Sequence, residues 1–480
     1  MSSTICAIAT ASGGALGVVR VSGPDAIATT ERIFHPLQGK PLSARKAHTL
    51  TFGHILDKEG NIVDEVLVSL FRAPHSYTGE DSTEISCHGS QYILSRVVEL
   101  LVAEGCEVAR PGEFTQRAFL SGKMDLSQAE AVADVIAADS AAAHRLAINQ
   151  MRGGVSSELR ILRDRLVHIA SLLELELDFA DHEDLEFADR TELLSLAQHI
   201  AQRLDTLVRS FSAGNALKNG VPVAIVGDAN AGKSTLLNRL LGEERAIVSD
   251  VRGTTRDVIE DTININGITF RLIDTAGIRH TEDSIERMGI ERTFERIRQA
   301  SIILWLIDST DLNTQLRTLA SQILPLCNGK RLLLLLNKAD NHSACTVDDY
   351  REIAHDLLHG RHIQSEDFSA TYDLPFSDIL PLSALTGEGL QTLKDALVSA
   401  AALPTSSQND LLITNARHYA ALHDALSAIL RVSEGLELGL SGDLVAQDLR
   451  ECIHHLSDII GEVTSDQVLH NIFKHFCIGK

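Results

Sequence analysis

Residues 227–234 have the sequence Gly-Asp-Ala-Asn-Ala-Gly-Lys-Ser, and this stretch decides the fold of the chain. The apolar run 221–226 is expected to form a buried strand, and the leucine-rich run 235–241 a helix. This order of elements predicts a phosphate-binding loop, because its glycines let backbone N–H groups approach polyphosphate oxygens closely. Lys233 is expected to reach the β- and γ-phosphates, and the Ser234 hydroxyl to bind Mg²⁺. The chain is therefore predicted to bind a nucleoside triphosphate.

A second motif, Asn337-Lys338-Ala339-Asp340, follows the apolar strand expected at 331–336. A carboxylate there accepts hydrogen bonds from the N1–H and the exocyclic amine of guanine. Adenine lacks this donor pair, so Asp340 is expected to select GTP. The segment Ser383-Ala384-Leu385, after another strand-like run, is placed to support the base from its backbone.

Two further segments predict the hydrolytic machinery. Asp274-Thr275-Ala276-Gly277 supplies a carboxylate on the Mg²⁺ side and a glycine N–H for the γ-phosphate. Gly253-Thr254-Thr255-Arg256-Asp257 supplies Thr255 as a second hydroxyl for Mg²⁺. Four elements in this order predict a Ras-like α/β GTPase domain.

One position departs from the Ras-type pattern. Ile278 stands where a glutamine would orient the attacking water, and an aliphatic side chain cannot do this. The nearby candidates for catalytic help are Arg256, Arg279, Glu282 and Glu286. Asn230 inside the loop has two interpretations: it coordinates a monovalent cation in place of an arginine finger, or it only tolerates a tight turn.

The sequence patterns predict a multidomain protein. Residues 1–122 alternate short β-rich runs with a helix at 91–103, which predicts an α+β domain. Helical sequence follows over 123–217, with an apolar stripe at Leu159, Leu162, Leu166, Ile169 and Leu173. A loop at 214–220 is expected to lead into the nucleotide domain, 218–402, inserted into an all-α domain that resumes over 403–480. In that last part Leu444, Leu449, Ile453, Leu456 and Ile460 are expected to form an apolar face, and the polar stretch 341–378 a surface insertion.

Composition limits the setting in which the protein works. The seven cysteines are scattered without a C-x-x-C pair, which fits reduced thiols in a cytoplasmic protein rather than a structural zinc site. There is no apolar run of the length of a membrane span and no secretory-type N-terminus. The net charge is −22, whereas proteins that bind nucleic acid usually carry a basic surface. We therefore expect a partner subunit to supply much of any binding to nucleic acid.

Motifs outside the nucleotide domain carry a resemblance to a known family. They include 17–23 (Gly-Val-Val-Arg-Val-Ser-Gly), 76–81 (Ser-Tyr-Thr-Gly-Glu-Asp), 110–120, 123–131, and the terminal Cys477-Ile478-Gly479-Lys480. With these motifs the whole chain resembles the tRNA modification GTPases called MnmE or TrmE. The departures are Asp228-Ala229 before the loop asparagine, Ser249 in place of threonine, and the long 341–378 stretch.

The resemblance implies homodimers in which GTP and K⁺ bring the GTPase domains together. By motif position, K⁺ would be held by Asn230 and by the carbonyls of Ser249, Val251 and Thr254. Glu286 would position the attacking water, beside Lys233 and Arg256 as the other expected catalytic residues. The nucleotide contacts are expected from Asn230, Ala231, Gly232, Lys233, Ser234, Thr235, Ser249, Asp250, Val251, Arg252, Gly253, Thr254, Thr255, Asp274, Thr275, Ala276, Gly277, Asn337, Lys338, Ala339, Asp340, Ser383, Ala384 and Leu385.

The resemblance also implies a tetrahydrofolate site, for the 5-formyl or methylene form, at Arg20, Glu84, Lys123 and Lys480. With an FAD-dependent partner of the MnmG or GidA type, in a heterotetramer or larger complex, the family adds an aminomethyl or carboxymethylaminomethyl group to C5 of the wobble uridine of certain tRNAs. Cys477 is either a nucleophile toward uridine C6 or a tail residue packed at the folate site.

Two other functions remain compatible with a GTPase. One is a ribosome-assembly factor, although the sequence lacks the basic RNA-binding tail expected of that class. The other is a dimeric signalling switch without chemistry on RNA.

Overall fold

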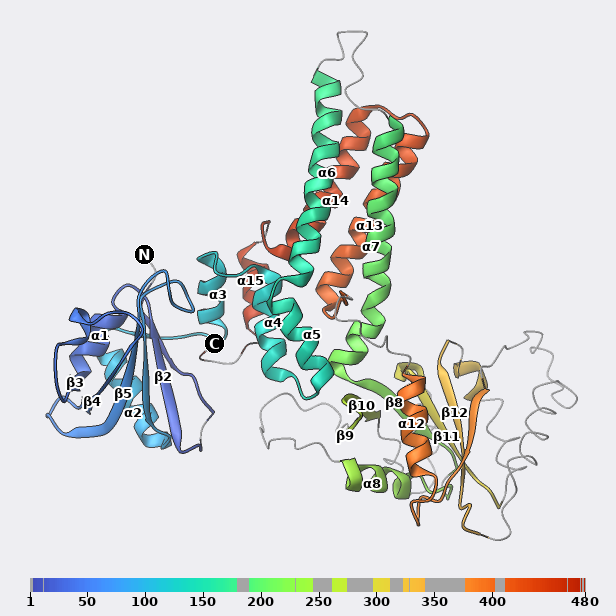
Figure 1. Cartoon of the computed structure of the whole chain (residues 1–480), viewed down its shortest axis with the longest axis horizontal. Coiled ribbons are helices and arrows are strands. Elements are labelled where there is room, and N and C mark those ends of the chain that lie inside the picture. The colour runs from blue at the N-terminus through green and yellow to red at the C-terminus, as the bar shows by residue number, and fades with distance from the viewer. Residues whose placement is uncertain are drawn as a thin grey trace, which may run out of the picture. The chain divides into compact units, whose positions relative to one another are not determined.

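The structure is a computed structural model, shown in Figure 1. It describes the chain except residues 1–2, 12, 179–189, 229, 245–260, 274–296, 311–322, 328, 342–375, 402–410, 464, 475, 477–478 and 480. The chain divides into two compact units. The first consists of residues 1–137, 147–208 and 416–480, and the second of residues 138–146 and 209–415.

The first unit begins with a seven-stranded mixed sheet of order β3-β4-β5-β6-β2-β1-β7. The helix expected at 91–103 is confirmed. Helices α1 and α2 pack on one face around a core that includes Val19, Val68, Ile85, Leu94 and Leu101. The elements are β1 (Ile5–Ile8), β2 (Leu16–Ser22), α1 (Ala26–Ile33), β3 (Phe34–Pro36), β4 (Thr49–Leu56), β5 (Ile62–Phe71), β6 (Ser82–His88), α2 (Gln91–Ala103) and β7 (Glu107–Val108).

Helices make up the rest of this unit, and α6 and α13 both pack along α14. The stripe expected from Leu159 to Leu173 is fully buried, as its spacing predicts. The face expected on α14 is only partly correct, because Leu444 is 49% exposed in the first turn while Leu449 and Leu456 are buried. The helices are α3 (Glu113–Leu120), α4 (Leu126–Ala137), α5 (Ala141–Met151), α6 (Gly154–Asp178), α7 (Arg190–Asn219), α13 (Ala416–Glu437), α14 (Gly442–Ile460) and α15 (Asp466–Phe473). Part of α5 and part of α7 belong to the second unit.

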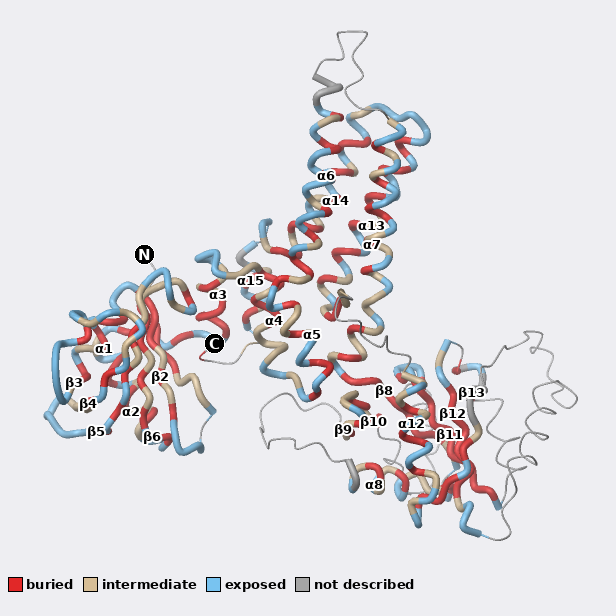
Figure 2. The backbone as a smooth tube through the Cα atoms, in the orientation of Figure 1, coloured by how far each residue is buried: buried red, intermediate tan, exposed pale blue. Residues whose placement is uncertain are grey.

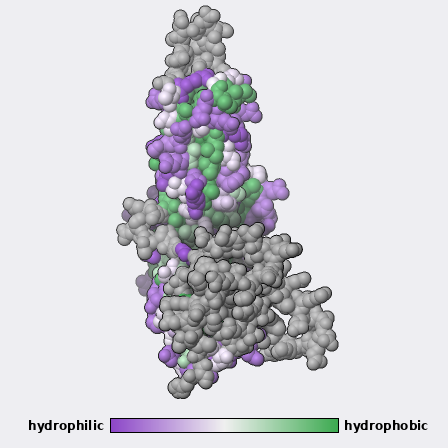
Figure 3. Space-filling view, turned by 90° about the vertical axis from the view of Figure 1, so that its right-hand side faces the viewer, coloured by the Kyte–Doolittle hydropathy of each residue, from purple (hydrophilic) through white to green (hydrophobic). Residues whose placement is uncertain are grey.

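Burial alternates along these helices in the way that amphipathic helices require (Figure 2). On the face turned to the viewer in Figure 3, hydrophilic residues cover much of the helical part, with hydrophobic residues between them.

The second unit contains a six-stranded sheet of order β13-β12-β11-β8-β10-β9, parallel except for β9. Apolar cores lie on both faces, so its central strands are continuous hydrophobic runs. Its elements are β8 (Val221–Val226), α8 (Lys233–Glu244), β9 (Asp261–Ile265), β10 (Ile268–Ile273), β11 (Ile302–Asp308), the short 3₁₀ turn η2 (Leu324–Cys327), β12 (Arg331–Asn337), β13 (Phe376–Pro381) and α12 (Leu390–Ala400).

One sequence expectation near this unit is wrong, and a second is wrong in its last part. The loop expected at 214–220 is helical as far as Asn219, because Gly214 serves close packing and does not turn the chain. A Cβ on Gly214 would lie 2.2 Å from the carbonyl oxygen of Ile413. The polar stretch 341–378 lies largely outside the described residues, but its last part, from Phe376, belongs to strand β13.

Candidate functional site

The phosphate-binding loop lies at the carboxyl end of β8, where parallel sheets place their ligands. Two of its glycines are required by the backbone. Gly227 approaches β11 so closely that a Cβ would lie 2.2 Å from the carbonyl oxygen of Leu306. Gly232 has φ +98°, and a Cβ there would lie 2.3 Å from Nδ2 of Asn337. Only glycine therefore fits both ends of the loop.

Lys233 begins helix α8 and folds back over the loop. Its ammonium group donates hydrogen bonds to the carbonyl oxygens of Gly227, at 2.7 Å, and Asp228, at 2.6 Å. Burial lowers the pKa of Lys233 from its ordinary value. Ser234 and Thr235 follow in the exposed first turn of this 12-residue helix. Free N–H groups of that turn, the helix dipole and the lysine suit a polyphosphate with its Mg²⁺.

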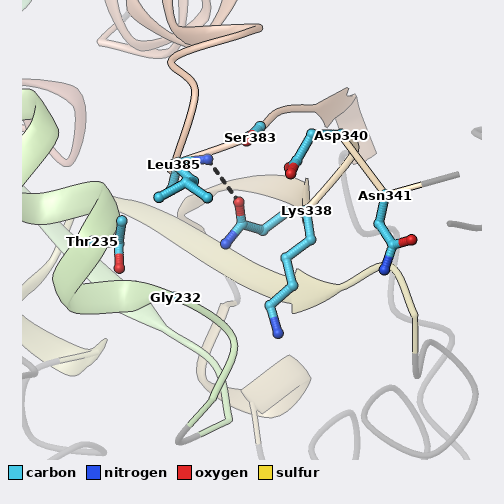
Figure 4. A pocket seen from close by; sticks show the side chains of 9 residues that line it. Gly232, Thr235, Lys338, Asp340, Asn341, Ser383 and Leu385 are labelled. Atoms are coloured by element: carbon cyan, nitrogen blue, oxygen red, sulfur yellow. Dashed lines mark hydrogen bonds between the residues drawn. The ribbon is translucent and has the colours of Figure 1, made fainter.

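Asn337 joins the phosphate-binding loop to the segment after β13. Its buried amide donates to the carbonyl oxygen of Ala231 at 2.6 Å and accepts from the backbone N–H of Ala384 at 2.9 Å. Figure 4 shows the second of these bonds as a dashed line. The side chain thus connects a loop expected to bind phosphates with a segment expected to bind the base.

A cavity of about 510 Å³ lies between these segments. Lys338 and Asp340 come from the segment that follows β12, while Ser383 and Leu385 come from the segment after β13 (Figure 4). Asp340 is exposed and keeps its carboxylate available for a ligand. The cavity is lined by Gly232, Thr235, Asn337, Lys338, Asp340, Asn341, Ser383, Ala384 and Leu385. Its acceptor and its size suit a purine base.

Sequence reasoning missed Asp308, which lies beside this cavity. Its carboxylate binds the ammonium group of Lys338, and Thr310 donates to it at 2.7 Å through Oγ1 and at 3.0 Å through N. Burial opposes ionisation, but the hydrogen bonds from Lys338 and Thr310 hold the pKa of Asp308 below its ordinary value. The only sequence signal was a carboxylate at the end of an apolar strand.

Several expected site residues lie outside the described part of the chain, so their positions stay predictions. They are Ser249, Asp250, Val251, Arg252, Gly253, Thr254, Thr255, Arg256, Asp274, Thr275, Ala276, Gly277, Ile278, Arg279, Glu282, Glu286, Cys477 and Lys480. Asn230 is described and exposed, at the outer turn of the loop.

A second cluster forms on the N-terminal sheet around Arg20. Its guanidinium donates to Glu84 at 2.9 Å and lies 5.3 Å from the ring centroid of Tyr77. The carbonyl oxygen of Gly479, near the end of the chain, accepts from Arg20 at 3.4 Å. Lys123 donates to the carbonyl oxygen of Pro74 at 2.9 Å, in the loop that carries Tyr77. The ion pair with its aromatic neighbour offers charge and a flat surface to a ring-containing ligand.

Two family models match the chain. The family model for the MnmE helical domain matches residues 126–477, and that for the GTP-binding protein TrmE N-terminus matches residues 4–123. The tRNA modification GTPase MnmE of Bacteroides thetaiotaomicron is 58% identical over 481 residues, covering 99% of both chains. The chain belongs to the MnmE family of tRNA modification GTPases.

Other MnmE proteins are similarly close. That of Phocaeicola vulgatus is 57% identical over 511 residues, covering 99% of both chains, and that of Parabacteroides distasonis is 53% identical over 482 residues, covering 100% of both. As a family member, the chain is a GTP-binding GTP hydrolase with a TrmE-type N-terminal domain, a helical domain and a P-loop GTPase domain. Among the described helices, none combines the length and apolar character needed to cross a membrane.

Proposed function

We propose that the cavity beside Asp340 binds the guanine of GTP and that the loop 227–234 binds its phosphates with Mg²⁺. The support is the bridge made by Asn337, which connects the two parts of one elongated site. Mg²⁺ is assigned to Ser234 and Thr255, and K⁺ to Asn230 with the carbonyls of Ser249, Val251 and Thr254. Ile278 cannot orient the attacking water, and by the family resemblance Glu286 positions it.

This hydrolysis serves the modification of tRNA in a homodimeric, cytoplasmic protein. The chain adds an aminomethyl or carboxymethylaminomethyl group to C5 of the wobble uridine, together with an FAD-dependent partner. Tetrahydrofolate supplies the one-carbon unit and binds at Arg20, Glu84, Lys123 and Lys480. The observation that carries the folate assignment is the hydrogen bond from Arg20 to Gly479, which joins the sheet to the C-terminal tail across 459 positions of sequence.

Mass analysis of tRNA nucleosides tests this function. A deletion strain is expected to lose the C5 modification at the wobble uridine, and the wild-type gene to restore it. A gene carrying Arg20→Met is expected not to restore it, although the purified protein still hydrolyses GTP. A gene carrying Arg96→Met, a half-buried arginine paired with Glu99 in α2, is the matched control and restores it. Unchanged modification in the deletion strain would contradict the proposal and favour a role in ribosome assembly.

A further inference from the structure

The last residue of β11, Asp308, lies beside the first residue of the base-binding motif. In the parallel ladder between β11 and β12, Asp308 is the register partner of Asn337, the last residue of β12, and Lys338 follows it in the chain. Strand β11 is buried along its whole length, and Asp308 itself is only 7% exposed. Burying a carboxylate is unfavourable unless its oxygens accept hydrogen bonds or form ion pairs.

The two oxygens of Asp308 have different partners. Oδ1 accepts both hydrogen bonds from Thr310, and Oδ2 accepts the one from Lys338. Thr310 therefore fixes the orientation of the carboxylate, and the carboxylate fixes the ammonium group of Lys338. The side chain of Lys338 stays 42% exposed along its length, where it lines the cavity.

The backbone conformation of Lys338 is a second reason why its ion pair with Asp308 matters. Its φ of +64° lies in the left-handed region, which is unfavourable for a residue with a Cβ. Neighbouring contacts must hold such a conformation. The ion pair with Asp308 is one of them, and the hydrogen bond from Asn341 N to Lys338 O is another.

We propose that Asp308 is a positioning residue for guanine-nucleotide binding, which holds Lys338 in place as one wall of the base cavity before the nucleotide arrives. The proposal rests on the assignment of this cavity to guanine. Asp308 touches no reacting atom, so it contributes to affinity and leaves the hydrolytic step unchanged. GTP and GDP share the base, and both depend on this wall to the same degree.

The decisive variant is Asp308→Asn, whose Oδ1 still accepts from Thr310 while the charge opposite Lys338 is lost. Nucleotide Kd values from fluorescent GDP and GTP analogues are expected to rise about tenfold for both, the size expected for one hydrogen bond between charged groups. The kcat at saturating GTP is expected to stay within about twofold of the wild-type value. Asp395→Asn, an exposed carboxylate on α12 bonded to Gln391, is the matched control and leaves both quantities unchanged.

A double-mutant cycle with Lys338→Met separates positioning from a general effect on folding. In the Lys338→Met background, Asp308→Asn is expected to change the Kd less than about twofold, because the ammonium group that Asp308 holds is gone. An equal loss in both backgrounds would overturn the proposal, as would an unchanged Kd in the single variant.

One further variant tests the guanine assignment separately. Asp340→Asn is expected to shift preference from GTP toward xanthosine triphosphate, because the amide donates where the carboxylate accepted. If this shift is absent, the base site is misassigned. If it is present and the Asp308 cycle is additive, only the role of Asp308 is wrong.

Discussion

At the scale of single residues, Glu130 shows how a buried charge ties distant parts of the first unit together. It lies on α4 and accepts from Arg417 at 3.0 and 3.2 Å, and its Oε2 lies 2.6 Å from Nε2 of His418. Arg417 also donates to the carbonyl oxygens of Asp458 and Ile459 at the end of α14. Both partners belong to the first turn of α13, where the chain returns from the second unit.

Burial alone would raise the pKa of Glu130, but His418 and Arg417 outweigh it and hold the pKa at about 2. Because this value lies below the ordinary 4.5, the carboxylate's contribution to stability is complete above about pH 4.5 and is lost as the pH falls toward 2. Glu130→Gln is expected to lower the free energy of unfolding at pH 7 by about 3–5 kcal/mol. The loss should shrink as the pH falls below 4.5.

Urea unfolding followed by circular dichroism at pH 7 and pH 4 measures this difference. The matched control is Glu174→Gln, which breaks the exposed ion pair with Arg450 and should cost about 0–1 kcal/mol. Equal effects of the two substitutions would show that the Glu130 contacts add nothing to stability.

At the scale of elements, α7 connects the helical part of the chain to the nucleotide-binding sheet. The helix runs from Arg190 to Asn219, and β8 begins two residues later at Val221. Near its end the helix packs against the segment that leaves the second unit, where Ser210 accepts from the N–H of Ile413 at 3.0 Å. Gly214 allows this approach, so a residue that predicts a loop in sequence is part of a helix–chain contact.

Replacing Gly214 by alanine separates helix propensity from packing. In an open helix the change should stabilise by about 0.5–1 kcal/mol, but here the new Cβ would lie 2.2 Å from a backbone oxygen. Gly214→Ala is therefore expected to lower the thermal unfolding midpoint. Gly242→Ala in α8, where nothing lies within 4 Å of the new Cβ, is the matched control and should raise it slightly. A stabilised Gly214→Ala protein would disprove the packing role.

At the scale of the whole molecule, the nucleotide-binding domain interrupts a helical domain whose C-terminal end returns to the N-terminal sheet. Gly112, before α3, lies against Phe473 of α15, and a Cβ on Gly479 would lie 2.3 Å from the carbonyl oxygen of Ile8. The tail therefore reaches the sheet that carries Arg20. Under the proposed function, GTP hydrolysis in the inserted domain is coupled through the dimer to chemistry at this sheet.

The proposed K⁺-dependent association of GTPase domains makes turnover depend on the cation. GTP turnover per chain is expected to rise several-fold when K⁺ replaces Na⁺ at constant ionic strength, and to increase with protein concentration. Asn230→Ala should remove the response to K⁺, and Glu286→Ala should lower kcat in either salt with nucleotide Kd nearly unchanged. Equal rates of the wild-type protein in the two salts would eliminate the cation site.

The strand and the helix on either side of the phosphate-binding loop were predictable, because they depend on consecutive residues whose backbone conformation is local. Gly227 and Gly232 have the close approach and the positive φ that the loop pattern implies. The contacts of Asp308 with Lys338 and of Glu130 with Arg417 were not predictable from the residues, and the contact of Arg20 with the C-terminal tail was expected only from the family resemblance. They join residues 30, 287 and 459 positions apart, which only the path of the folded chain brings together. The local sequence pattern thus determines which chemical groups the chain carries. Tertiary packing decides which charged residues stabilise those groups, because a buried charge is stable only where a partner distant in sequence lies next to it.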